Sequence, residues 1–243
     1  MRPDSAGPED AGAAPWFGFS ADERSALEAF GGTDRASLKR VVPAEFAERE
    51  SRLLNCRECH GKVQGIPAFD VLGGKLKPEW SRAFIAGEIS YKPRPWLEAR
   101  MPAFPKYAEL MAAGLAMQQG WPPQSPAEPP VDMDAARIGQ KLISTMGGFS
   151  CVSCHAVGSV PAMQTGDTAG VNFVYTRSRV TRDYFERWLR YPQLIDPSTK
   201  MPAYFQDQTK SPLTNVLDGD VAKQINALWE YLQLGDKMPP PPK

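Results

Sequence analysis

Apolar residues recur every three or four positions in most of the patterned segments of this chain, which is the spacing of an amphipathic α-helix. Pro and Gly interrupt the pattern between these segments, as they do in turns and loops. The pattern therefore predicts an all-α chain. The predicted helices cover about residues 20–30, 43–54, 78–87, 105–119, 135–146 and 218–234, and one more carries Tyr184, Phe185, Trp188 and Leu189.

Capping residues or a proline mark the starts of three of these helices. Ser20 and Glu23 are spaced as in a capping box. Pro43 suits the first position of the next helix, because proline has no amide hydrogen to leave unpaired there. Asp134 is expected to cap the helix that begins at Ala135.

A proline-rich stretch divides the chain. Residues 121–131 hold five Pro in eleven positions, a composition typical of a semi-rigid linker. Domains of about a hundred residues, one on each side of such a linker, are of ordinary size. We therefore predict an N-terminal arm and short helix at 1–42, a first domain at 43–120, a linker at 121–133, and a second domain with a Pro-rich tail at 134–243.

Two pentapeptides, Cys56-Arg57-Glu58-Cys59-His60 and Cys151-Val152-Ser153-Cys154-His155, contain all four Cys and both His of the chain. Two thiols spaced by two residues can add across the two vinyl groups of one haem, and the adjacent imidazole then reaches the iron. This is the signature of covalent haem c attachment. Its occurrence twice predicts two covalently bound haem c groups.

Two other roles for the cysteines fit the spacing less well. Zinc ribbons pair their Cys-X-X-Cys units about 15–20 residues apart, whereas these two units are nearly a hundred residues apart and each is followed by His. Redox-active disulfides have no need of a His after the second Cys. Haem attachment is therefore the preferred interpretation.

The segments that follow the two motifs also match, which predicts an internal duplication. Pro67 and Pro161 each follow a motif, and a helix rich in aromatic residues comes after each. Met101 and Met201 are separated by a hundred residues and share the context basic-Met-Pro-Ala-aromatic.

Each haem iron needs a ligand opposite its His, or an open position, and the chain has no third His. A Met thioether is the natural candidate, because it favours ferrous iron. Met101 and Met201 lie 41 and 46 residues beyond His60 and His155. We therefore predict these two Met as the sixth ligands. The alternative role, flexible filling of the core, is expected of Met111, Met117 and Met146.

With these features, both halves resemble class I cytochromes c. The resemblance implies two tandem domains, each wrapped around one covalent haem c. In that family a small residue of the leading helix crosses an aromatic side of the last helix. Gly139 matches the small residue, and Trp229 and Tyr231 match the aromatic side. The first half has no clear Gly in its leading helix.

The resemblance also implies a role for Pro67, since in the family a Pro after the motif lends its carbonyl to the N–H of the His that binds iron. Such a bond fixes the ring and its tautomer. The alternative, a Pro that only shapes the loop, fits the residues equally well.

The resemblance further implies haem attachment outside the cytoplasm, hence a periplasmic or otherwise extracytoplasmic location. The segment 217–232 is also similar to cytochrome modules of secreted planctomycete and verrucomicrobial proteins. The first residues lack the apolar core of a secretory signal. We therefore expect that a signal or anchor was removed, or that the chain is part of a longer protein.

The charge balance bears on partners. With 28 basic and 28 acidic residues the formal net charge is zero, so no global field attracts nucleic acid or an anionic membrane. No apolar run approaches the roughly 18 residues of a membrane span. The expected partners are redox proteins, such as a dehydrogenase, an oxidase or a respiratory complex.

Irons with two protein ligands leave no position for a substrate, so the predicted function is one-electron transfer as a dihaem carrier or relay, and not catalysis. Two alternatives stay open. A dihaem enzyme, such as a peroxidase or a thiosulfate-oxidising dehydrogenase, needs an open or labile iron and often a spare His or Cys. An electron-transfer subunit of a membrane respiratory or photosynthetic complex would use the same residues as a free carrier.

A run of arginines in the second half has two interpretations. It could partner haem propionates or an acidic protein, although a solvated helix face is the interpretation we favour. The run comprises Arg177, Arg179, Arg182, Arg187 and Arg190.

Overall fold

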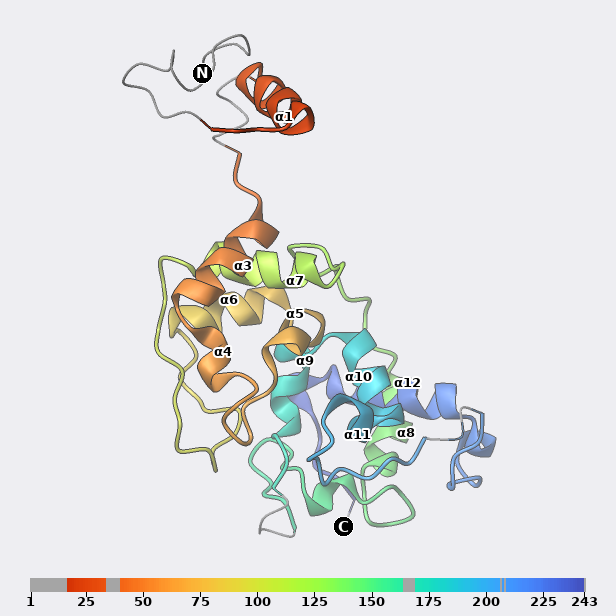
Figure 1. The fold of residues 1–243 in the computed structure, drawn as a ribbon. Helices are drawn as coiled ribbons and strands as arrows, with labels where there is room; N and C mark the ends of the chain where they lie inside the picture. Colours follow the sequence, from red (N-terminus) through yellow and green to blue (C-terminus); the bar gives the residue numbers. More distant parts are fainter. Residues whose placement is uncertain (1–16, 34–39, 164–168, 206, 208, 243) are drawn as a thin grey trace, which may run out of the picture. The chain divides into compact units, whose positions relative to one another are not determined.

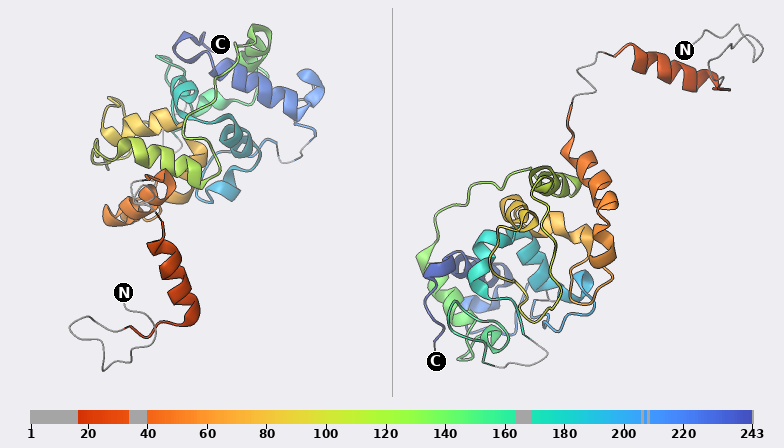
Figure 2. Two further views of the ribbon diagram at one scale, coloured as in Figure 1. Left: turned by 90° about the horizontal axis from the view of Figure 1, so that it is seen from above. Right: turned by 90° about the vertical axis from the view of Figure 1, so that its left-hand side faces the viewer.

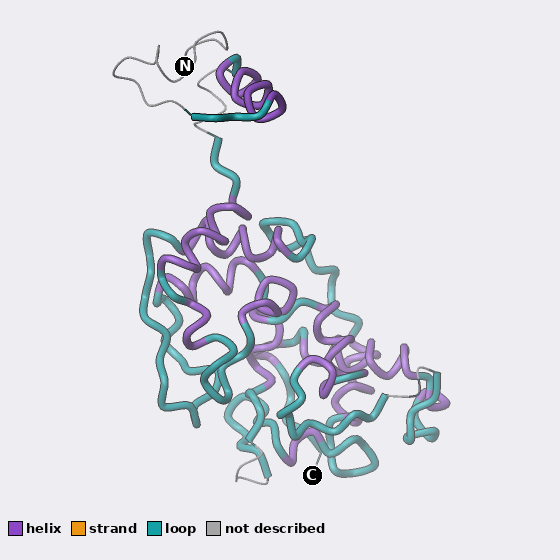
Figure 3. Tube along the Cα trace, viewed as in Figure 1, coloured by secondary structure: helices purple, strands orange, loops and turns teal. Residues whose placement is uncertain are grey.

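The structure is a computed structural model that describes residues 17–33, 40–163, 169–205, 207 and 209–242. These residues are helical, with isolated β-bridges and no longer strand among them (Figure 3). The all-α prediction is confirmed at this level. The chain separates into two compact units, Met1–Val41 and Val42–Lys243, which are described one at a time.

The first unit contains one described helix, α1 (Ala21–Gly31). The predicted capping box is present, because the Ser20 side chain accepts from the Glu23 N–H and the Glu23 carboxylate accepts from the Ser20 N–H. No residue of α1 is buried. Most of the predicted N-terminal arm lies outside the described residues.

In the second unit, the leading and closing helices of the first half are α3 (Pro43–Leu53) and α7 (Ala108–Gln118), which pack against each other (Figure 1). Gly114 of α7 lies at their contact. A Cβ added there would overlap the Pro43 carbonyl oxygen and lie 2.6 Å from the Ala47 Cβ. The small residue of this crossing therefore belongs to the closing helix, which explains why the leading helix needs no Gly.

The second half closes in the same way, through α8 (Met133–Leu142) and α12 (Val221–Leu232) (Figure 2). A Cβ added at Gly139 would overlap the Ala227 carbonyl oxygen and lie 2.8 Å from the Tyr231 Cβ. The expected contact of Gly139 with Tyr231 is therefore present. Trp229 faces away from it, with its ring centroid 5.2 Å from that of Phe185.

Each half has its own hydrophobic cluster. The first is formed by buried residues between 47 and 115, and the second by buried residues between 136 and 232. Trp80 and Met111 are buried in the first, and Phe205 and Trp229 in the second. The division of this unit into two cytochrome domains remains a prediction.

Short helices connect these pairs. In the first half they are α4 (Cys56–Cys59), η2 (Phe69–Val71), α5 (Leu72–Lys75) and α6 (Pro78–Ala86). In the second half they are η3 (Cys151–Ser153), η4 (Phe173–Tyr175), α9 (Thr176–Arg179), α10 (Arg182–Arg190), α11 (Pro192–Ile195) and η5 (Leu217–Gly219), and η6 (Gly235–Lys237) follows α12.

The two halves meet at an antiparallel bridge between Leu76 and Val180, which occupy equivalent positions in the repeat. Leu76 is seven residues beyond Phe69, and Val180 is seven beyond Phe173. The bonds are reciprocal: Lys77 N–H donates to the Arg179 carbonyl at 2.9 Å, and Thr181 N–H donates to the Lys75 carbonyl at 3.0 Å.

The proline-rich linker is held against the first half. Both the N–H and the hydroxyl of Ser125 donate to the Glu79 carboxylate at 2.7 Å, and Lys77 forms an ion pair with Glu128 at 2.8 Å. The C-terminal tail is held as well, since the Tyr231 hydroxyl donates to the Pro239 carbonyl at 2.6 Å.

Three predicted helix starts are corrected. The N-cap of α8 is Asp132, whose carboxylate accepts from the Asp134 and Ala135 N–H groups, so Asp134 lies inside the helix. The closing helix starts after Asp220, not at Asp218, whose φ of 54° is left-handed. The helix predicted from Pro105 begins at Ala108, because a turn occupies residues 105–107. Periodicity does not locate such turns.

We expect Gly114→Ala and Gly139→Ala each to destabilise the protein by about 1–3 kcal/mol, because the added methyl group would overlap a backbone carbonyl of the facing helix. Helix propensity alone predicts that a Gly to Ala substitution raises the free energy of unfolding by about 1 kcal/mol. Urea unfolding followed by circular dichroism measures the difference. Gly31→Ala is the matched control, since nothing lies within 4 Å of its added Cβ. An increase in stability for Gly114→Ala and Gly139→Ala would contradict the close crossing of the helices.

Candidate functional site

Each Cys-X-X-Cys-His motif is wound into one helical turn that begins after a left-handed residue. Asn55 has φ 53° and ψ 38°, and Ser150 has φ 57° and ψ 29°. The His60 N–H donates to the Cys56 carbonyl at 3.0 Å, and the His155 N–H donates to the Cys151 carbonyl at 2.9 Å. The backbone of each motif is thus closed into one turn from the first Cys to the His, and the left-handed residue redirects the chain from the leading helix into it.

All four thiols are free, and each motif keeps its two cysteines together. Burial raises the pKa of Cys56, and it raises the pKa of Cys151 to about 12. These thiols are therefore protonated at neutral pH. In the part of the chain that the structure describes, no three His, Cys, Asp or Glu side chains are grouped as metal ligands.

The His60 ring is oriented by the backbone of the loop that follows it. Its Nδ1 lies 3.0 Å from the Pro67 carbonyl oxygen, as the resemblance implied. Burial lowers the pKa of His60, and the carbonyl opposes that shift. A neutral ring with Nδ1–H donated to Pro67 leaves Nε2 as the basic nitrogen, which is the form that binds a metal.

In the second half the corresponding carbonyl does not belong to Pro161, the proline that follows this motif. His155 Nδ1 lies 2.7 Å from the carbonyl oxygen of Val171. The loop is longer here, since Phe173 is eighteen residues beyond His155 whereas Phe69 is nine beyond His60. Pro161 falls early in this longer loop.

The equivalent carbonyls are recognised by counting back from the phenylalanine that follows. Pro67 is two residues before Phe69, and Val171 is two residues before Phe173. Both phenylalanines start a 3-10 turn, η2 or η4. This spacing from the following phenylalanine is the sequence signal that identifies Val171. Counting residues forward from the motif does not find Val171, because the two loops differ in length.

Aromatic rings and a glycine fix His155 more tightly than His60. The His155 and Phe173 rings are stacked, 4.4 Å apart and 10° from parallel, whereas His60 and Phe69 meet edge to face at 6.0 Å. A Cβ added at Gly170 would lie 2.5 Å from His155 Nδ1 and 2.7 Å from its Nε2. Only glycine lets the backbone approach this ring so closely.

The two predicted sulfur ligands lie against the same clusters as their motifs. Met101 and Cys56 pack on the first cluster, and Met201 and Cys151 pack on the second. Each Met therefore contacts the cluster of its own half, and its role as a ligand stays a prediction. Met201 is also held by Trp188, whose Nε1–H donates to the Met201 sulfur at 2.8 Å.

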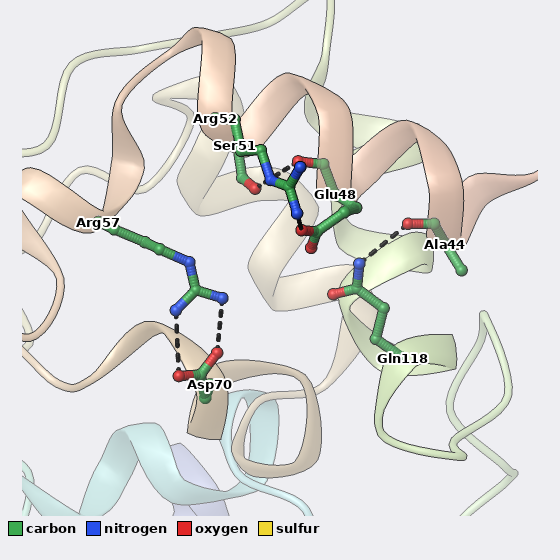
Figure 4. A network of polar contacts seen from close by, with 7 residues as sticks. All are labelled: Ala44, Glu48, Ser51, Arg52, Arg57, Asp70 and Gln118. Atoms are coloured by element: carbon green, nitrogen blue, oxygen red, sulfur yellow. Dashed lines mark hydrogen bonds and ion pairs between the residues drawn. The ribbon is translucent and has the colours of Figure 1, made fainter.

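An exposed ion pair connects the first motif to the segment that carries the equivalent phenylalanine. Arg57, inside the motif, forms two hydrogen bonds with the Asp70 carboxylate at 2.7 and 3.0 Å (Figure 4). The guanidinium lowers the pKa of Asp70. Nearby, Gln118 of α7 donates to the Ala44 carbonyl of α3 at 2.9 Å (Figure 4). The first contact holds the motif to η2, and the second adds a polar contact to the crossing of α3 and α7.

The arginines of the run do not form a single basic patch, because they have different partners and different burial. Arg187 pairs with Asp183 at 2.9 Å, and the Arg182 guanidinium donates to Asn226 at 2.8 Å. These are contacts of a solvated helix face, the interpretation favoured from the sequence. Arg179 differs, because it is only 6% exposed.

Comparison of the chain with protein-family models, with curated proteins and with solved structures found no match. Among the described helices, none has the length and apolar character needed to cross a membrane.

We expect Gly170→Ala to displace the His155 ring and break its bond to Val171, because the ring is wedged between Phe173 and the added methyl group. The chain has only two His, so ¹⁵N NMR resolves both rings and reports which nitrogen carries the proton. The His155 signals should shift while those of His60 stay, which makes His60 the internal control. Unchanged His155 signals would refute the close approach.

Proposed function

We propose that this protein is a dihaem c-type cytochrome that transfers single electrons as a carrier or relay. The observation that carries the proposal is the repeated motif geometry. In both halves the motif forms one turn, and the His that ends it has its Nδ1 at hydrogen-bond distance from a backbone carbonyl, which leaves Nε2 for a metal. Every Cys and His of the chain takes part.

This donor set fits haem c chemically. Two thiols can form the two thioether bonds, and the imidazole next to them supplies one axial ligand. The bound haem would supply an iron that takes up and releases one electron. The chain's own part is to hold each His ring by its Nδ1–H, to keep the tautomer fixed, and to bury the motif against an apolar cluster.

Met101 and Met201 are the proposed ligands on the other side of each iron. Each packs on the cluster that its motif also contacts, and a thioether there would stabilise the ferrous state. With both axial positions taken, no position is open for a substrate, which favours electron transfer over a peroxidase or a thiosulfate-oxidising enzyme.

A relay is favoured over two independent carriers because the halves share backbone hydrogen bonds across the Leu76–Val180 bridge. The ring centroids of Tyr91 and Tyr175, one from each half, are 3.8 Å apart in a parallel stack. We further propose an extracytoplasmic location, where haem c attachment takes place, and redox proteins as partners.

We expect the purified protein to carry two haems per chain, both low-spin, as measured by the pyridine haemochrome assay and by electron paramagnetic resonance. Cys59→Ala and Cys154→Ala should each leave one haem attached through a single thioether bond, which moves the pyridine haemochrome band of that haem to longer wavelength, because one vinyl group stays unreacted. A chain without covalent haem would overturn the proposal. A high-spin iron that binds carbon monoxide readily would favour one of the dihaem enzymes over the electron carrier.

We expect Met101→Ala and Met201→Ala each to abolish the far-red absorption band of ferric Met–sulfur ligation at one haem and to leave the other haem unchanged. Potentiometric titration should show a lower reduction potential for the affected haem. Met117→Ala and Met146→Ala are the matched controls, since these side chains are 40% and 61% exposed and, contrary to expectation, do not fill the core. Retention of the band in either ligand variant would reject that Met as a ligand.

A further inference from the structure

Two buried cations occupy equivalent positions where the two halves meet. Lys75 ends α5 and Arg179 ends α9, each one residue before the bridge between Leu76 and Val180. Lys75 is 8% exposed and Arg179 is 6% exposed. The repeat therefore places one positive charge from each half inside the same junction.

Each cation contacts the aromatic helix of the opposite half, since α5 lies against α10 and α9 lies against α6. Lys75 Nζ lies 4.8 Å from the centroid of the Tyr184 ring and 5.6 Å from that of Trp188, both on α10. The Arg179 guanidinium carbon lies 5.2 Å from the centroid of the Trp80 ring, on α6. Contact with a ring face offsets only part of the cost of removing a charge from water.

A third cation, the partly buried Arg94, belongs to the same cluster. Burial and the charges of Arg179 and Arg94 lower the pKa of Lys75 far below its usual value, and burial and Arg94 lower the pKa of Arg179 to about 10. The three positive groups therefore repel one another. Such a cluster is costly unless negative charge is supplied.

The described residues supply almost no negative charge to this cluster. No Asp or Glu of the described residues lies within 4.0 Å of the charged nitrogens of Lys75, Arg94 or Arg179. The carboxylate that favours the charged forms of Lys75 and Arg94 is Asp196, which is exposed and accepts hydrogen bonds from Ser198. Arg179 Nε is buried and has no hydrogen-bond partner. A buried donor without an acceptor is rare in folded proteins.

We propose that Lys75, Arg94 and Arg179 form one carboxylate-binding site shared by the two halves and that it takes the propionates of the haems, an inference that rests on the function proposed above. Propionate carboxylates are anionic acceptors that a covalently attached haem always brings with it. They would neutralise the cluster and supply the acceptor that Arg179 Nε lacks. The site is absent from either half alone.

The sign of a stability change tests this site. If carboxylates occupy it, Arg179→Met leaves them unpaired, and the melting temperature of the two-haem protein falls. If nothing occupies it, the same substitution removes an uncompensated buried charge, and the melting temperature stays or rises. Arg137→Met is the matched control, because the Arg137 side chain is 72% exposed and paired with Asp134. Arg179→Lys, which keeps the charge, should restore part of the loss.

Potentiometry on the same variants gives a second readout. Loss of a buried positive charge disfavours the ferrous state, so the potentials of both haems should shift downwards in Arg179→Met, Lys75→Met and Arg94→Met, and stay in Arg137→Met. Three variants from different segments keep the test independent of any one failing to fold. A shift at one haem only would overturn the shared site.

Added malonate distinguishes a free anion from the propionates. If a free dicarboxylate is the occupant, malonate should raise the melting temperature of the unsubstituted protein but not that of Arg179→Met, and this would overturn the assignment to haem. A two-haem protein in which Arg179→Met and Arg137→Met behave alike overturns the site but leaves the proposed function intact. A chain without haem overturns both.

Discussion

The close crossing of two helices at a glycine closes each half of this protein, and the rest of each half is arranged around it. At Gly114 and at Gly139 the facing backbone comes so near that no side chain fits. The leading helix of each crossing is followed by the motif of its half. The two halves use opposite partners, since the glycine is on the closing helix in the first and on the leading helix in the second. Both halves therefore have the same close helix crossing, although the glycine that permits it lies on a different helix in each.

The histidines likewise make the same interaction in both halves through different residues. In both halves Nδ1 faces a backbone carbonyl, but the carbonyl belongs to Pro67 in one and to Val171 in the other. What the two share is the distance from the phenylalanine that begins the next turn. A backbone carbonyl can come from any residue type, so the bond constrains the path of the chain and leaves the side chain free.

The helices and the motifs were predictable from the sequence because their signals are local. Pro43, the capping box at Ser20 and the apolar stripes each act within a few residues. Val171 and Gly170 were not predictable in this way, because their role depends on a longer loop that folds back onto His155. Arg179 was singled out only as part of an arginine run. Its burial depends on packing against Trp80, which lies about a hundred residues earlier.

The shared junction bears on why the two halves occur as a tandem pair. Lys75 is covered by rings of the second half, and Arg179 by a ring of the first. Separating the halves would expose these rings to water and leave each cation without its aromatic partner, so each half completes the surroundings of a charge that the other carries. The reciprocal backbone bonds at the Leu76–Val180 bridge hold the junction in one arrangement. A duplicated domain that contributes one cation from each copy concentrates positive charge at the boundary, and that charge favours anionic groups from both sides at once.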